Sequence, residues 1–134
     1  MTDRKEKLSS TARVHLFDHG RLAYLQIPAT NVRESAAFYL TNFDWQTRGE
    51  GTEHLSFQDA TGDMIGAWVT DLVISRQPGV LAYVYVHGID ATLARIAASG
   101  GEVVKPPYPE GDLWVATFRD PAGNVLGIWQ EGPS

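Results

Sequence analysis

The sequence lacks cysteine altogether, which excludes disulfides, zinc ribbons, thiol nucleophiles and thiolate-held clusters. Basic residues are few: 11 Lys and Arg stand against 16 Asp and Glu, and the net charge of −5 argues against a nucleic-acid partner. No apolar run approaches the roughly 20 residues that cross a bilayer, and no secretion signal or nucleotide-binding glycine motif is present. We therefore expect a cytoplasmic protein with no nucleic-acid partner, membrane partner or cofactor.

The length of 134 residues suits one domain. Residues 1–20 are rich in charged and small polar side chains, which predicts a mobile N-terminal extension in which 13–17 is a candidate edge strand. The remaining residues, 21–134, are expected to form a single domain. Its two modules would be residues 21–71 and 79–131, joined by a linker at 72–78.

Strand and helix periodicities alternate in the same order in both modules. A helix is expected after Asn31, where Glu34 has the spacing of a capping box, and another from Ile89 to a stop at Gly100. The proline-rich stretch 105–111 predicts a stiff loop at a rim. Strands are expected at residues 21–28, 43–48, 53–58, 63–70, 80–87, 102–106, 112–119 and 124–130. This order, βαβββ twice, predicts an α+β fold.

An internal repeat supports two related modules. Residues 57–68 read FQDATGDMIGAW and residues 118–129 read FRDPAGNVLGIW. Hairpin turns alone explain the shared Asp and Gly of the turn, with Asp59 and Asp120 bonding their own backbone, but not the shared G-x-W beyond it. Such a repeat indicates duplication, with each unit packing against its twin.

Alternation along the strands predicts which side chains share a face. One face is expected to lie under the helices, and the other gathers large rings with polar tips. Its expected members are Tyr24, Gln26, Met64, Trp68, Tyr83, Tyr85, His87 and Trp129. Such a face suits a ligand pocket with an apolar body and a few hydrogen-bonding groups. A dimer or inter-module interface, which also favours Tyr and Trp, is the alternative.

Three stretches together resemble the vicinal oxygen chelate superfamily, which contains glyoxalases, bleomycin-resistance proteins and extradiol dioxygenases. They are LQIPATNVRESAAFYLTNFDW (25–45), YVHGIDATLARIAASGGEVV (85–104) and FRDPAGNVLGIWQ (118–130). The resemblance implies two tandem βαβββ modules that form a cupped mixed sheet, often completed as a homodimer.

Enzymes of that superfamily hold a divalent metal with His, Glu or Gln at four strand positions. Here the resemblance puts those positions on Tyr24, on Leu81 or Tyr83, and on Gly66 and Gly127. None is an imidazole or a carboxylate, so we expect no metal site. The two glycines are open to two interpretations: space for a flat ligand beside Trp68 and Trp129, or close backbone approach.

The interpretation we favour is a metal-independent protein that binds a small aromatic or amphipathic molecule, as bleomycin-resistance proteins sequester theirs. Its expected contacts are Tyr24, Gln26, Trp68, Tyr83, Tyr85, Trp114 and Trp129. Three alternatives stay open: a metal-independent isomerase or lyase, a metal-dependent glyoxalase or dioxygenase, and a dimer interaction module. The candidate acid and base residues for an enzyme are His54, Tyr24 and Glu110.

Overall fold

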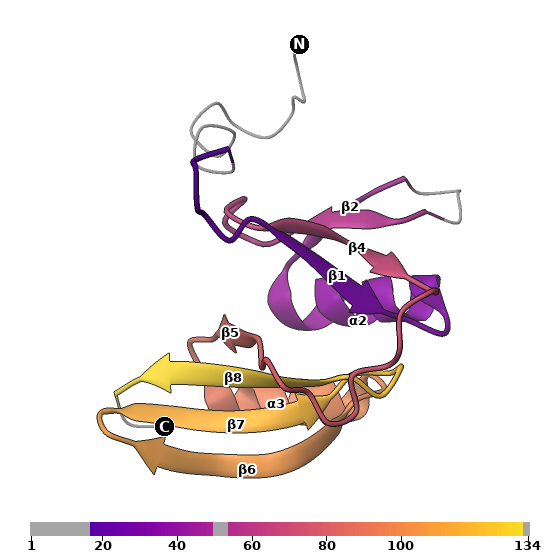
Figure 1. Ribbon diagram of the computed structural model, residues 1–134. Helices are drawn as coiled ribbons and strands as arrows, with labels where there is room; N and C mark the ends of the chain where they lie inside the picture. Colours follow the sequence, from indigo (N-terminus) through magenta and orange to yellow (C-terminus); the bar gives the residue numbers. More distant parts are fainter. Residues whose placement is uncertain (1–16, 50–53, 133–134) are drawn as a thin grey trace.

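The computed structural model describes residues 17–49 and 54–132, which fold into two βαβββ modules (Figure 1). The expected strand at 13–17 and most of the expected extension, 1–20, therefore lie outside the described residues. The first module contains β1 (Tyr24–Pro28), α2 (Val32–Phe43), β2 (Gln46–Arg48), β3 (Ser56–Gln58) and β4 (Ile65–Val69). The second contains β5 (Tyr83–Tyr85), α3 (Ile89–Ala98), β6 (Glu102–Glu110), β7 (Leu113–Arg119) and β8 (Val125–Glu131). The predicted α+β class and the repeated order of elements are confirmed.

Helix α2 begins where the capping box predicted. The Asn31 side chain accepts a 3.0 Å hydrogen bond from the Glu34 amide, which satisfies one of the amides that a helix start leaves open. The helix ends at Phe43, and Asp44 adopts the left-handed conformation with φ 59°. The strand expected at 43–48 therefore starts later, at Gln46, because residue 43 still belongs to the helix and Asp44 forms its C-cap.

The proline-rich stretch 105–111 was expected to be a loop, and this is wrong for most of its length. Strand β6 runs from Glu102 to Glu110 and, among the strands that the structure describes, pairs only with β7. A strand at the edge of a sheet tolerates proline, because one side of its backbone has no neighbour that needs an N–H donor. Two register shifts, between Val103 and Lys105 and between Lys105 and Tyr108, accommodate the prolines.

Each module forms its own four-stranded mixed sheet. The strand orders are β1-β4-β3-β2 and β5-β8-β7-β6, so β1 and β5 occupy the same place in their sheets, each parallel to the strand beside it. Both are edge strands within the described part of the chain. Figure 1 shows the two sheets separated, with α2 between the first sheet and the second module.

One hydrophobic core joins the modules. Rings of α2 meet Phe118 of β7, with ring centroids 6.0 Å apart for Phe38 and 5.8 Å apart for Phe43. Helix α2 therefore packs against its own sheet and against the second module. Neither helix in the described ranges is long and apolar enough to cross a membrane.

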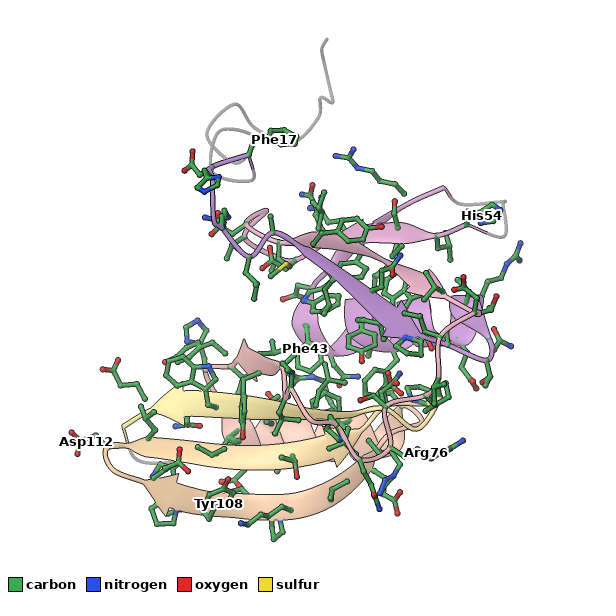
Figure 2. All side chains as sticks on the ribbon, viewed as in Figure 1. Phe17, Phe43, His54, Arg76, Tyr108 and Asp112 are labelled. Atoms are coloured by element: carbon green, nitrogen blue, oxygen red, sulfur yellow. The ribbon has the colours of Figure 1, made fainter. Side chains whose placement is uncertain are left out.

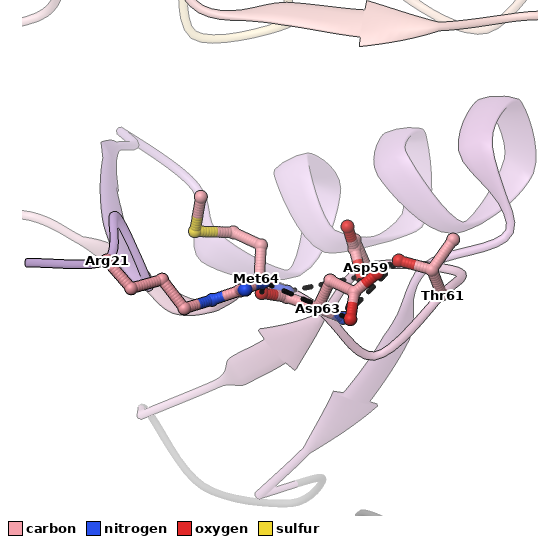
Figure 3. Close-up of polar contacts among 5 residues, drawn as sticks. All are labelled: Arg21, Asp59, Thr61, Asp63 and Met64. Atoms are coloured by element: carbon pink, nitrogen blue, oxygen red, sulfur yellow. Dashed lines mark hydrogen bonds and ion pairs between the residues drawn. The ribbon is translucent and has the colours of Figure 1, made fainter. Parts of the chain in front are cut away.

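The repeated hairpins differ by one residue, and the difference changes which side chains are buried. The first turn spans residues 59–64, between the paired Gln58 and Ile65, whereas the second spans only 120–124. In the first turn Oδ1 of Asp59 accepts hydrogen bonds from the amides of Asp63 and Met64 (Figure 3). The longer turn advances β4 by one residue relative to β8.

A shift of one residue turns every side chain of a strand to the opposite face. Gly66 and Trp68 therefore lie beside Leu25 and Ile27 in the core, although the matching Gly127 and Trp129 face away from α3. The predicted position of Trp68 on the open face is wrong. Its side chain is 2% exposed and its ring lies 4.8 Å from that of Phe57.

Candidate functional site

The open face of the second sheet carries a row of aromatic side chains. The register aligns Tyr85 of β5, Trp129 of β8, Val115 of β7 and Tyr108 of β6 across all four strands. The rings of Tyr85 and Trp129 meet edge to face at 4.6 Å between centroids. Because Tyr85 is 43% exposed, this pair presents ring surface to a molecule outside the sheet.

Tyr83 extends the same aromatic face towards the far edge of the sheet. Its pKa is raised from the ordinary value of 10.0 by partial burial, then by the neighbouring Tyr108 and by the charge of Glu110. Lys105 lies over the Tyr108 ring, with Nζ 3.9 Å from the centroid. The three tyrosines thus supply ring surface and hydroxyl groups, and Glu110 supplies a nearby negative charge.

A cleft of about 610 Å³ adjoins this face along β5. It lies between the end of α2, the 59–64 turn and the start of α3. Its lining includes Tyr83, Tyr85, His87, Asn42, Asp44, Met64, Thr92 and Arg95. Sequence reasoning did not place Asn42 or Arg95 at a site, since nothing in their spacing links α2 with α3. Tyr83 and Tyr85 therefore border both the open face and the cleft.

The other predicted contacts divide between the two sheets. Tyr24 and Gln26 lie on the exposed outer face of the first sheet, and Tyr24 is 56% exposed. Trp114 is half-buried and packs against the core, on the face of β7 opposite Val115 and Trp129. The structure brings Tyr83, Tyr85 and Trp129 together, and places Trp68 and Trp114 on core-facing sides of their strands.

Both strand glycines permit close approach and leave no vacant space. A side chain at Gly66 would meet the Leu25 carbonyl oxygen and the Phe57 ring, and one at Gly127 would meet the Tyr83 ring. The tyrosine ring thus occupies the volume that a side chain at Gly127 would fill. Of the two interpretations of these glycines, close approach is the one that the packing supports.

The candidate acid and base residues are dispersed. His54 is exposed beyond the first sheet (Figure 2), whereas Tyr24 lies on β1 and Glu110 ends β6 on the second sheet. His87 is exposed, with its ring 5.7 Å from that of Tyr85. Of the three candidates, the described residues place Glu110 beside the aromatic row, where the His87 imidazole also lies next to Tyr85.

The strand positions that the family resemblance assigns to metal ligands carry no imidazole or carboxylate in this chain. Across β1 and β4, Tyr24 pairs with Ile65, and across β5 and β8, Tyr83 pairs with Gly127. Divalent transition metals prefer imidazole and carboxylate ligands, and tyrosine, isoleucine and glycine provide neither. Among residues 17–49 and 54–132, no group of three His, Cys, Asp or Glu side chains gathers to hold a metal.

Comparison with known proteins identifies the family of this chain. Residues 21–128 match the sequence model of the glyoxalase/bleomycin resistance protein/dioxygenase superfamily. A putative glyoxylase of Mycobacterium tuberculosis, CFP32, is 35% identical over 49 residues, which are 36% of this chain and 19% of that protein. The chain therefore matches about a fifth of the length of this relative.

Solved structures share the fold at low sequence identity. The fosfomycin resistance protein FosX of Listeria monocytogenes superposes with a TM-score of 0.69 at 15% identity, over 84% of this chain and 94% of that one. TnmS3, an antibiotic binding protein from Streptomyces sp. CB03234, gives a TM-score of 0.64 at 22% identity, over 84% and 97%.

Proposed function

The chain belongs to the glyoxalase/bleomycin resistance protein/dioxygenase superfamily, and we propose that it binds a small aromatic or amphipathic molecule without a metal. The observation that carries the proposal is the aromatic row of the second sheet. Tyr83 and Tyr85 are each 43% exposed, and Trp129 stands edge to face with Tyr85 beside the cleft. Ring faces stack on flat ligands, and the hydroxyl groups orient them.

The net charge of −5 and Glu110 beside Tyr83 favour a neutral or cationic ligand, although Lys105 over the Tyr108 ring brings one positive charge to the row. Glu110 lies close enough to act on Tyr83, and the Tyr85 hydroxyl accepts from the Glu131 amide at 3.4 Å. A cation over an exposed aromatic ring gains about 0.5–1 kcal/mol, and a neighbouring carboxylate adds to this attraction. TnmS3, which shares this fold, is described as an antibiotic binding protein. This likeness supports the proposal that the present chain sequesters its ligand.

The proposed site is completed by a second copy of the chain. Tyr24 and Gln26 lie exposed on the first sheet, and β1 and β5 are edge strands of separate sheets. A homodimer that sets β1 of one chain beside β5 of the other would place Tyr24 of the partner subunit opposite Tyr83. Such pairing would satisfy the open backbone groups of both edge strands.

Calorimetric titration with the planar cation proflavine tests the ligand site. We expect saturable binding that Trp129→Ala and Tyr85→Ala each weaken about tenfold, because each removes one ring contact. Val73→Ala, at an exposed apolar residue outside the row, is the matched control and should leave affinity unchanged. Equal affinity in all four proteins would contradict the aromatic row as the site.

Mixing two inactive variants tests the dimer. If each site takes Tyr24 from one chain and Tyr83 from the other, a mixture of Tyr24→Ala and Tyr83→Ala chains forms heterodimers with one intact site. Proflavine binding should then reappear after subunit exchange, with at most one binding site in each heterodimer. A monomeric mass by light scattering, or no recovery on mixing, would refute the shared site.

A further inference from the structure

The outer face of the first sheet carries amide and guanidinium groups where the second sheet carries its aromatic row. Helix α2 covers the opposite, inner face of the first sheet (Figure 1). Two rows of cross-strand neighbours make up the outer face: Tyr24, Ile65, Gln58 and Gln46, and beside them Gln26, Ala67, Ser56 and Arg48. The side chains that β2 and β3 add to these rows are therefore all polar.

Arg48 fixes the direction in which two glutamine amides of this face point. Its Nη2 donates to Oε1 of Gln58 at 3.4 Å, and Nε2 of Gln58 donates to Oε1 of Gln46 at 3.2 Å. A guanidinium group has donors and no acceptor, so Gln58 turns its oxygen towards Arg48 and its nitrogen towards Gln46. Each amide oxygen thus already accepts a hydrogen bond within the group, which leaves N–H donors for a molecule outside the sheet.

These donors are accessible, and they carry a positive charge. Gln46 and Arg48 are exposed, and Gln58 is half-buried. Hydrogen bonds from a guanidinium group to a carboxylate are about twice as strong as those between neutral groups. The aromatic row has the opposite character, because it offers ring surface with Glu110 beside it. The two outer faces therefore suit different ends of an amphipathic molecule.

The homodimer proposed above makes these two faces neighbours. With β1 of one chain beside β5 of the other, the strand order across the junction is β8-β5 followed by β1-β4-β3 of the partner subunit. Neighbouring strands lie about 4.8 Å apart, so β3 of the partner subunit lies roughly 14 Å from β5 and roughly 19 Å from β8. A ligand that covers Tyr85 and Trp129 reaches the polar group only if it is elongated.

We propose, building on that ligand site and its dimer, that the ligand is an elongated molecule with rings at one end and a carboxylate at the other. The rings lie on Tyr85 and Trp129, and the carboxylate accepts hydrogen bonds from Gln58 and Arg48 of the partner subunit. The charges match at both ends, since Glu110 lies near the rings and the guanidinium group near the carboxylate. Gln58 and Arg48 thereby select among ring compounds.

Three acridines separate the two ends of the site in calorimetric titrations at low ionic strength. Aminoacridine presents the rings alone, a second compound carries a hexanoic acid arm on the same nitrogen, and the third carries the matching hexanamide. We expect the acid to bind about tenfold more tightly than aminoacridine, with the amide between them, because a charged acceptor makes the stronger hydrogen bonds. Added salt should reduce the advantage of the acid.

Variants identify the residues that hold the carboxylate. Arg48→Ala and Gln58→Ala should each remove most of the advantage of the acid and leave the affinity for aminoacridine unchanged. Arg48→Lys keeps the charge and should retain part of the advantage. Trp129→Ala should weaken the acid and aminoacridine by the same factor. Arg33→Ala, at an exposed arginine of α2, is the matched control and should change neither affinity.

The ligand site and its carboxylate end fail in distinguishable ways. If the wild type binds none of the acridines, the aromatic row is not the site, and selection by the polar group is refuted with it. If the wild type binds aminoacridine and the acid equally, the aromatic row stands and the carboxylate end is refuted. The carboxylate end is also refuted if Arg48→Ala and Arg33→Ala bind the acid with the same affinity.

Discussion

The hydroxyl group of Tyr39 donates a 2.8 Å hydrogen bond to Oδ2 of Asp120, and the two side chains are 0% and 3% exposed. Tyr39 belongs to α2 of the first module, and Asp120 opens the last hairpin turn of the second. Oδ1 of the same carboxylate accepts from the amides of Ala122, Gly123 and Asn124. One buried carboxylate thus organises its own turn and joins the two modules.

Asn124 continues this junction. Its side-chain amide donates to the Pro28 carbonyl oxygen at 2.7 Å and to Oδ2 of Asp120 at 2.9 Å. Its side-chain oxygen accepts from the Ser75 amide at 2.8 Å. The turn is therefore hydrogen-bonded to β1 and to the segment that connects the modules, in addition to α2.

Tyr39→Phe should destabilise the protein by about 1–3 kcal/mol, because the buried carboxylate loses a partner while the ring is kept. The free energy of unfolding in urea measures the change. Tyr24→Phe, at an exposed tyrosine, should change it by less than about 0.5 kcal/mol. Similar values for both variants would show that the buried hydrogen bond adds no net stability.

The same tyrosine makes stability depend on alkaline pH. Burial, and then the charge and hydrogen bond of Asp120, raise the pKa of Tyr39 well above its ordinary value of 10.0. Above pH 10 the unfolded chain loses this proton while the folded chain keeps it, so the free energy of unfolding falls as pH rises. Urea titrations between pH 9 and 11 should show a shallower fall in Tyr39→Phe than in the wild type, and parallel curves would contradict this.

The repeated tryptophans should respond differently to the same substitution. Trp68→Ala removes a core side chain packed against Phe57 and Tyr39, and should cost about 3–5 kcal/mol. Trp129→Ala removes a half-buried ring from the open face, and should cost roughly 1–2 kcal/mol. Thermal and urea unfolding of both variants give the comparison, and equal losses would contradict the one-residue difference between the two strands.

The two strand glycines form a second matched pair. Gly66→Ala would force a methyl group against the Leu25 carbonyl oxygen, which belongs to the backbone of β1, and should cost about 2–4 kcal/mol. The atoms nearest to a methyl group at Gly127 belong to the Tyr83 ring, which is 43% exposed and can turn away, so Gly127→Ala should cost about 1 kcal/mol or less. Because it moves Tyr83, Gly127→Ala should also weaken proflavine binding. The free energy of unfolding in urea compares the two variants, and a larger loss in Gly127→Ala than in Gly66→Ala would contradict this packing.

Much of the fold follows from local signals in the sequence. The helix starting at Asn31, the order of strands and the backbone-bonding role of Asp59 and Asp120 were all predicted, because each depends on residues within a few positions of one another. The bond from Asp120 to Tyr39 was not predicted. The two residues are 81 positions apart, and no spacing rule relates a buried turn to a helix of another module.

The candidate site was predicted less fully, for a specific physical reason. Alternation placed Tyr83, Tyr85 and Trp129 on one face correctly, since β5 and β8 pair as their patterns suggest. It failed for Trp68, because facing depends on how many residues the preceding turn contains, and 59–64 contains one more than 120–124. The composition of the two turns is similar, so their lengths could not be distinguished before the pairing was known.

The longer first turn also determines how well each module tolerates substitutions in its last strand. A substitution at 127 or 129 alters a surface that meets other molecules, and the fold can absorb it. The same substitution at 66 or 68 alters the packing beneath α2. Two related segments of sequence therefore tolerate substitution differently: the surface of the second can change its recognition properties, while the residues of the first are constrained by packing in the interior.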